Sequence, residues 1–139
     1  MNAAGETVPV YHDAFASLAN VILEDSWILS VDASLTELTF RVDLVLAPLH
    51  PSYRQPATGQ TRCYRTGTLV VVSESAVILR LSSLPPAVDA AGEVDYGHID
   101  TFAPVGGLDN AVWALTGDWG EVLVRKPRVR VQFDEPAET

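Results

Sequence analysis

One segment of the chain constrains the fold more than any other, because its apolar residues alternate strictly along the chain. Leu38, Phe40, Val42, Leu44 and Leu46 are all apolar, and threonine, arginine and aspartate stand between most of them. Successive side chains of a β-strand point to opposite faces, so this alternation places five apolar side chains on one face. The segment is therefore predicted to be a strand with one buried face and with Phe40 in the core.

Shorter strand patterns, separated by turn signals, fill most of the remaining chain. They lie at residues 27–31, 62–64, 68–72, 76–81, 94–102, 111–115, 121–125 and 128–133, with a bulge predicted at Gly67. A parallel sheet needs a crossover helix between its strands, and no such helices are predicted here. The predicted fold class is mainly β (or α+β): an antiparallel β-sandwich or barrel of about seven to nine short strands.

One amphipathic helix is predicted ahead of the strands, over residues 11–24. Its apolar residues recur at spacings of three and four, which is typical of one helical stripe: Phe15, Leu18, Ala19, Ile22 and Leu23. The 139 residues fit a single domain, 1–139, with a core over roughly residues 11–133 and frayed ends.

The charge of the chain restricts its partners. Eighteen acidic residues against nine lysines and arginines give a formal charge of −9. Nucleic acids and anionic membrane surfaces would be repelled, because both are bound largely through cationic side chains. The acids are also unevenly placed, since residues 81–124 hold seven carboxylates and no lysine or arginine. The partner most compatible with this field is a basic protein.

The sequence contains no motif that indicates a cellular compartment, a cofactor or a catalytic centre. It has no signal-peptide pattern and no apolar run approaching the roughly 18 residues of a membrane-spanning helix. Cys63 is its one cysteine, which favours the reducing cytoplasm. Glycine-rich phosphate motifs, zinc motifs and nucleophile-elbow motifs are all missing. We therefore predict no cofactor and no catalytic residue.

Two candidate chemical sites were weighed and set aside. His98 is flanked by Asp95 and Asp100, which supply metal-ligand atoms, but their spacing fits no known metal loop and a solvated loop is favoured. Cys63 lies between Arg62 and Arg65, whose charges would favour a thiolate. No base or oxyanion donor is placed beside it by any motif, so a small buried strand residue is the favoured interpretation.

Tryptophans offer one candidate binding anchor. Trp119 lies in a turn between two glycines, and two interpretations are open for it. Its ring either folds back over the edge of the core or projects as an anchor for a partner. Trp27 and Trp113 fall inside strand patterns and are predicted to lie in the core.

The segment 47–62 is a second candidate, because it is long and holds three prolines. Prolines lower the entropic cost of presenting side chains, and Tyr53 and Arg54 are of types common in interfaces. Both residue types also occur in ordinary surface loops, so the plain alternative is a loop that contacts nothing.

Three short stretches together resemble a family. They are CYRTGTL at residues 63–69, GEVDYGHIDTF at 92–102 and GDWGE at 117–121. They resemble a group of small bacterial proteins of about this length with no assigned activity, loosely similar to the immunity proteins of bacterial toxin systems. The resemblance spans residues 11–133, implies an interaction module, and carries no catalytic or binding residue with it.

These observations favour a non-enzymatic, acidic, cytoplasmic module that binds a basic protein. The expected contact residues are Trp119, Tyr53, Arg54, Asp95 and Asp100. The alternative is a small-molecule-binding β-barrel, or a small enzyme whose site has no recognisable motif. An enclosed apolar cavity would support the alternative, and an acidic face would support the module.

Overall fold

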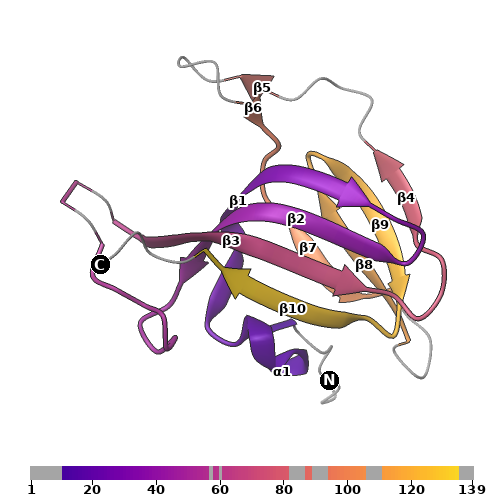
Figure 1. Cartoon of the computed structure of the whole chain (residues 1–139), viewed down its shortest axis with the longest axis horizontal. Helices are drawn as coiled ribbons and strands as arrows, with labels where there is room; N and C mark the ends of the chain where they lie inside the picture. Colours follow the sequence, from indigo (N-terminus) through magenta and orange to yellow (C-terminus); the bar gives the residue numbers. More distant parts are fainter. Residues whose placement is uncertain are drawn as a thin grey trace, which may run out of the picture.

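The computed structural model describes residues 11–56, 58–59, 61–81, 87–88, 94–105 and 111–134, without the side chains at 81, 87, 88, 94 and 95. Two antiparallel sheets of four strands each face one another as two layers (Figure 1). The first sheet has the order β1 (Val21–Ala33), β2 (Glu37–Leu46), β3 (Cys63–Val72) and β10 (Arg128–Phe133). The second has the order β4 (Ile78–Leu81), β9 (Gly120–Arg125), β8 (Val112–Gly117) and β7 (Thr101–Pro104).

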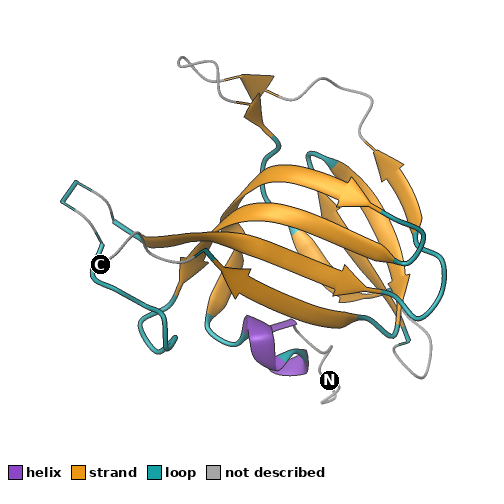
Figure 2. Ribbon diagram, in the orientation of Figure 1, coloured by secondary structure: helices purple, strands orange, loops and turns teal. Residues whose placement is uncertain are grey.

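A small hairpin of two-residue strands, β5 (Ala87–Val88) and β6 (Val94–Asp95), stands apart from the two layers. Strands dominate the described chain, and helix is confined to one short piece (Figure 2). Each four-stranded sheet ends in two edge strands and does not close on itself. The predicted mainly β, antiparallel fold is confirmed, and the sheets form a sandwich and not a barrel.

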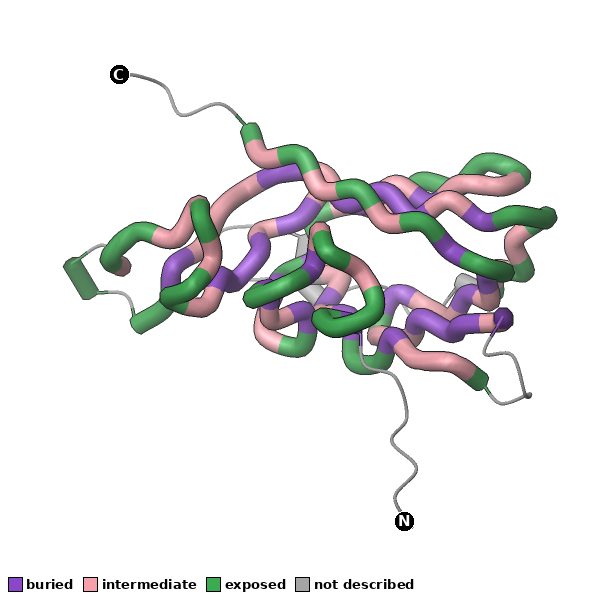
Figure 3. The backbone as a smooth tube through the Cα atoms, turned by 90° about the horizontal axis from the view of Figure 1, so that it is seen from below, coloured by how far each residue is buried: buried purple, intermediate pink, exposed green. Residues whose placement is uncertain are grey.

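The core lies between the two layers, where the alternation in β2 places it. Leu38, Phe40, Val42 and Leu44 are fully buried, whereas Thr39 on the opposite face is only half-buried. Buried positions alternate with intermediate ones along most of β2, and Figure 3 shows the burial of both layers along the backbone. Cys63, at the start of β3, is buried as predicted, and so is Trp113 from the second sheet, which joins the same core cluster.

The predicted helix over residues 11–24 is wrong in its length. The structure has one helical turn, α1 (Tyr11–Ala14), and a 3-10 turn, η1 (Ala16–Leu18), before β1 begins at Val21. Asn20 has a φ of 62°, a left-handed conformation that asparagine tolerates and that ends the helical direction.

A second periodicity competes with the helical one after Asn20. Val21 and Leu23 are buried while Ile22 and Glu24 are not, which is the alternation of a strand. Val21 and Ile22 pair with Leu46 and Val45 at the end of β2. This pairing gives the segment sheet hydrogen bonds that an isolated amphipathic helix would lack, so tertiary structure overrides the helical spacing.

Trp27 was predicted to lie in the core and instead is 37% exposed. The register between β1 and β2 shifts between Ile22 and Trp27, so β1 carries extra residues there. A bulge changes which face the following residues occupy. After it, Ser26 and Ile28 point inward and Trp27 points outward.

Gly67 forms no bulge, so that prediction is also wrong. It lies inside the continuous strand β3, paired with Val42 on one side and Phe133 on the other. A Cβ atom at this position would lie 2.5 Å from the carbonyl oxygen of Gln132. Glycine is required here because the two backbones approach closely.

The inward and outward faces of β2 should respond differently to truncation. Phe40→Ala is expected to lower the free energy of unfolding by about 3–5 kcal/mol, because it deletes a fully buried aromatic ring. Thr39→Ala is expected to lower it by less than about 1 kcal/mol. Urea titration of both variants measures the difference, and equal midpoints would contradict the observed register.

Candidate functional site

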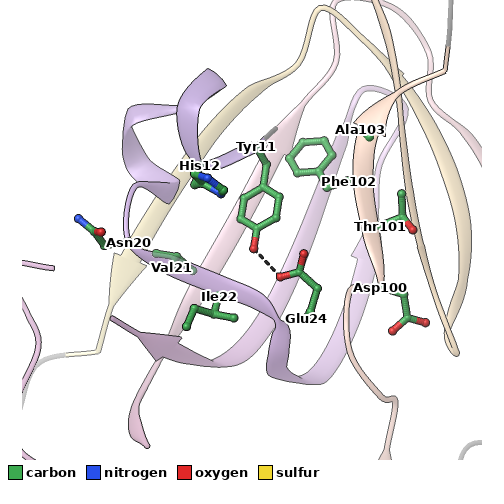
Figure 4. A pocket seen from close by; sticks show the side chains of 10 residues that line it. All are labelled: Tyr11, His12, Asn20, Val21, Ile22, Glu24, Asp100, Thr101, Phe102 and Ala103. Carbon is green, nitrogen blue, oxygen red and sulfur yellow. Dashed lines mark hydrogen bonds between the residues drawn. The ribbon is translucent and has the colours of Figure 1, made fainter. Parts of the chain in front are cut away.

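An open cleft of about 510 Å³ lies where α1 meets the edge strands β1 and β7 (Figure 4). One wall comes from the first residues of β1, and the other comes from β7 and the residue before it. The lining residues are Tyr11, His12, Asn20, Val21, Ile22, Glu24, Asp100, Thr101, Phe102 and Ala103.

The inner side of the cleft is aromatic. The ring of Tyr11 lies parallel to that of Phe102 at 6.4 Å, and Phe15 stacks on Phe102 at 5.2 Å. The Trp113 ring meets Phe15 and Phe102 edge-on at 5.0 and 5.2 Å. These contacts fix the ring positions, because stacked and edge-to-face geometries are the favourable ones.

Tyr11 links this aromatic cluster to the acidic wall. Its hydroxyl accepts a hydrogen bond from the Leu23 backbone N–H at 3.0 Å and donates one to Glu24 Oε1 at 2.6 Å. Burial and the Glu24 carboxylate raise the pKa of Tyr11 well above its usual value. The hydroxyl therefore stays protonated at neutral pH and acts as a donor, not as a base.

Carboxylates set the electrostatic character of the cleft. Glu24 and Asp100 face it from opposite walls, and the lining residues include no lysine or arginine (Figure 4). The guanidinium of Arg62 forms an ion pair at 2.9 Å with Asp25, the residue that follows Glu24. Such a cleft favours a cation or a group rich in hydrogen-bond donors, because carboxylates only accept.

The bulge in β1 positions Glu24. Ser26, almost fully buried, fills the bulge with its hydroxyl, which accepts the Val45 N–H at 2.9 Å and donates to the Ile22 carbonyl at 2.7 Å. These two bonds satisfy backbone groups that the shifted register would otherwise leave unpaired.

Asp100 is positioned by the segment Tyr96–Asp100, which we call the strap. The Ile28 N–H donates to the Gly97 carbonyl at 2.8 Å, and the Asp100 N–H donates to the Thr116 carbonyl at 2.7 Å. His98 Nδ1 lies 2.6 Å from the Ser26 carbonyl oxygen. A carbonyl only accepts, so this geometry assigns the proton to Nδ1.

Trp119 holds the strap from the second sheet. Its ring is 4% exposed, and it meets Phe40 edge-on at 5.2 Å, so the interpretation as a ring folded over the core is confirmed. Its indole N–H donates to the His98 carbonyl at 3.1 Å. A Cβ atom on Gly117 would collide with that same carbonyl and with the indole of Trp119. Trp119 is therefore a positioning residue and does not project to a partner.

The other sequence candidates lie away from the cleft lining. Tyr53 is half-buried against the core cluster, and Arg54 is exposed, with its backbone N–H on Cys63 Sγ at 3.3 Å. The side chain of Asp95 lies outside the described residues. Of the four predicted contact residues whose side chains the structure describes, Asp100 alone lines the cleft.

Sequence reasoning missed Tyr11 and Glu24. The predicted helix over residues 11–24 would place Tyr11 at one end and Glu24 at the other, too far apart to touch. In the structure they lie on α1 and β1 and form a hydrogen bond. The signal that could have revealed Glu24 is the alternation that begins at Val21, because it makes residue 24 part of a strand.

Among the described side chains, no three of histidine, cysteine, aspartate and glutamate gather to hold a metal ion. Since Asp95 is outside that set, the expected lack of a metal site at Asp95, His98 and Asp100 stays a prediction. In the same part of the chain, no helix has the length and apolar character needed to cross a bilayer. The chain matches no protein-family model, no curated protein and no solved structure.

The loop after β2 is folded around His50. Its Nδ1 accepts the Ser52 N–H at 2.9 Å, and its carbonyl accepts the Tyr53 N–H at 3.0 Å. Its ring meets Phe133 edge-on at 5.6 Å. Arg65 donates to the Ser52 carbonyl at 2.8 Å, and burial together with the Arg65 charge lowers the pKa of His50.

Removing the indole donor of Trp119 should loosen the strap. Trp119→Phe keeps a ring against Phe40 and is expected to cost about 1–2 kcal/mol, because the His98 carbonyl loses its partner. Amide hydrogen exchange should accelerate at Ile28, whose N–H donates to Gly97 of the strap, and at Asp100 of the strap, whose N–H donates to Thr116. The matched control is Trp27→Phe at an exposed ring, and equal effects of the two changes would refute the positioning role.

Lowering the pH should reduce the free energy of unfolding through the protonation of His50. The folded-state pKa of His50 is lowered, so only the unfolded chain takes up this proton as pH falls through the usual value of about 6.5. Stability is therefore full above that pH and declines below it, until the folded-state pKa is reached. Urea unfolding across this window should show a smaller decline for His50→Gln than for the exposed control His12→Gln. Identical slopes would contradict the effect.

Proposed function

We propose that the chain is a non-enzymatic binding module whose cleft receives a basic side chain, lysine or arginine, from a partner protein. The observation that carries the proposal is that Glu24 and Asp100 both line one cleft, which has an aromatic inner side and no lysine or arginine among its described lining residues. Two carboxylates facing one cavity repel each other, and a cation placed between them would relieve that repulsion.

The rest of the cleft suits such a side chain. The long apolar stem of lysine or arginine packs on apolar surface, and half-buried Ile22 offers such surface in the cleft lining. Its charged end reaches carboxylates that remain accessible. The −9 charge of the chain would also attract a basic partner at long range and speed association.

Small-molecule binding is the second candidate, because clefts of roughly 300–1,000 Å³ commonly hold ligands of that size. A small cationic ligand would use the same two carboxylates. Catalysis is less supported, because Tyr11 is kept protonated and His12 is largely exposed, with Asp13 as its carboxylate contact at 4.0 Å. Neither residue is arranged as an activated nucleophile or base.

The resemblance to small bacterial proteins and to toxin-immunity proteins supports a partner that is itself a protein. We place the module in the cytoplasm as part of the same proposal, on the grounds of its single, buried cysteine and its acidity.

A titration with Nα-acetyl-arginine methylamide, followed by NMR, tests the proposal. Amide shifts should concentrate at Glu24, Asp100 and Phe102, and the neutral citrulline analogue should produce none of them. Glu24→Gln keeps an acceptor for Tyr11 and removes the charge, so it should weaken binding by about three- to tenfold, and Asp100→Asn should act similarly.

The matched control is Asp32→Asn, which removes an exposed acid of β1 that does not line the cleft. Binding should be unchanged in that variant. Equal binding of the citrulline analogue, or shifts that avoid the cleft, would overturn the proposal.

A further inference from the structure

A patch of exposed apolar surface lies directly beyond the cleft on the outer edge of β1. We call it the Trp27 patch, and it consists of Trp27, Leu29 and His98. Trp27 is 37% exposed and Leu29 is 40% exposed. The His98 ring lies against Trp27 with 4.3 Å between ring centroids. The patch results from the bulge in β1, which turns Trp27 toward the outside of the sheet.

Two elements connect the patch to the cleft. Along β1, Glu24 lines the cleft and Trp27 follows it by three residues. Along the strap, Asp100 lines the cleft and His98 precedes it by two residues. The His98 contact with the Ser26 carbonyl ties these two elements together, so the cleft and the patch form one fixed surface.

Acids predominate around the patch, and two arginines in this region are each paired with an acid: Arg41 of β2, opposite Ser30, with Asp134 at 2.8 Å, and Arg62 with Asp25 at 2.9 Å. β1 carries Glu24, Asp25 and Asp32 and no lysine or arginine. Asp43 of β2 lies opposite Trp27 in the register and accepts a hydrogen bond from the Thr66 hydroxyl. The surface from the cleft to Asp32 therefore combines carboxylates with exposed apolar rings.

Trp27 contributes little to the fold from this position. Its ring lies outside the core cluster and packs on the ring of His98 at the surface. Tryptophan is the residue type most enriched in binding hot spots, because it combines a large apolar face with a polar edge. Its exposure beside a cleft is thus better accounted for by a partner than by stability.

We propose that the occupant of this surface is an extended polypeptide segment, with a basic side chain in the cleft and an apolar side chain on the Trp27 patch. The inference rests on the proposed function and specifies its partner. An extended segment in the polyproline II conformation has about three residues per turn and rises roughly 3.1 Å per residue, so side chains three positions apart lie on one side. Two residues between the basic and apolar anchors therefore suffice. A free small cation would fill the cleft and leave the patch bare.

The probe is the tetrapeptide acetyl-Arg-Ser-Ser-Phe-amide. Trp113 and Trp119 are 6% and 4% exposed, so acrylamide quenching of the native protein reports mainly on Trp27. The peptide should protect this emission from quenching. It should also bind at least about fivefold more tightly than acetyl-Arg-Ser-Ser-Ser-amide, which lacks the apolar anchor.

Variants separate the two anchors. Trp27→Ala should remove the advantage of the phenylalanine peptide and leave the affinity for Nα-acetyl-arginine methylamide unchanged. The matched control is Leu35→Ala, which truncates a 74% exposed leucine in the turn after β1, and it should change neither affinity. Circular dichroism of each variant verifies that the fold is retained.

Each result decides between the two proposals. If Nα-acetyl-arginine methylamide binds at the cleft but the phenylalanine peptide binds no more tightly than the serine peptide, the proposed polypeptide occupant is overturned and the proposed function stands. If neither compound binds, the proposed function fails and the segment fails with it. Trp27 could also become protected from quenching without peptide, as the protein concentration rises. If sedimentation then shows dimers, the occupant of the surface is a second copy of the chain and the peptide proposal is overturned.

Discussion

The buried side chain of Ser26 holds the bulge on which the rest of the candidate site depends. Its hydroxyl bonds with Val45 and Ile22, and its carbonyl receives the ring of His98. Without these bonds the extra residues of β1 would leave buried backbone groups unpaired, at a cost of about 1–3 kcal/mol for each group. The bulge turns Trp27 outward, and the same local structure sets Glu24 in the cleft.

Three glycines and a tryptophan in the short stretches singled out from the sequence have packing roles. Gly67 permits close contact of β3 with β10, and Gly117 leaves room for the His98 carbonyl. Gly97 has a φ of 80°, and a Cβ there would meet the Asp118 side chain at 2.9 Å. Trp119 closes the arrangement with its indole N–H. Gly97, Gly117 and Trp119 hold the strap in place, and the strap carries Asp100.

The cleft combines a rigid apolar side with accessible charge. Stacked rings hold Tyr11, and Tyr11 in turn holds Glu24 through a protonated hydroxyl. A carboxylate fixed in this way loses little conformational freedom when a ligand arrives, so more of the interaction energy is available for binding. Fixed carboxylates beside an aromatic surface suit recognition of a cation better than chemical transformation of a substrate.

The sequence by itself determined the mainly β, antiparallel class and the buried face of β2, because period-two alternation and turn residues act over short distances. It left open whether the sheets form a sandwich or a barrel and whether Trp119 points inward. The end of the helix, the exposure of Trp27, the contact of Glu24 with Tyr11 and the placing of Asp100 in the same cleft were decided by tertiary structure alone. Each depends on how β1 pairs with β2 and with the strap, and those partners lie far along the chain. A bulge leaves no fixed mark in the apolar pattern of one strand, because the number of extra residues is defined only against the strand beside it.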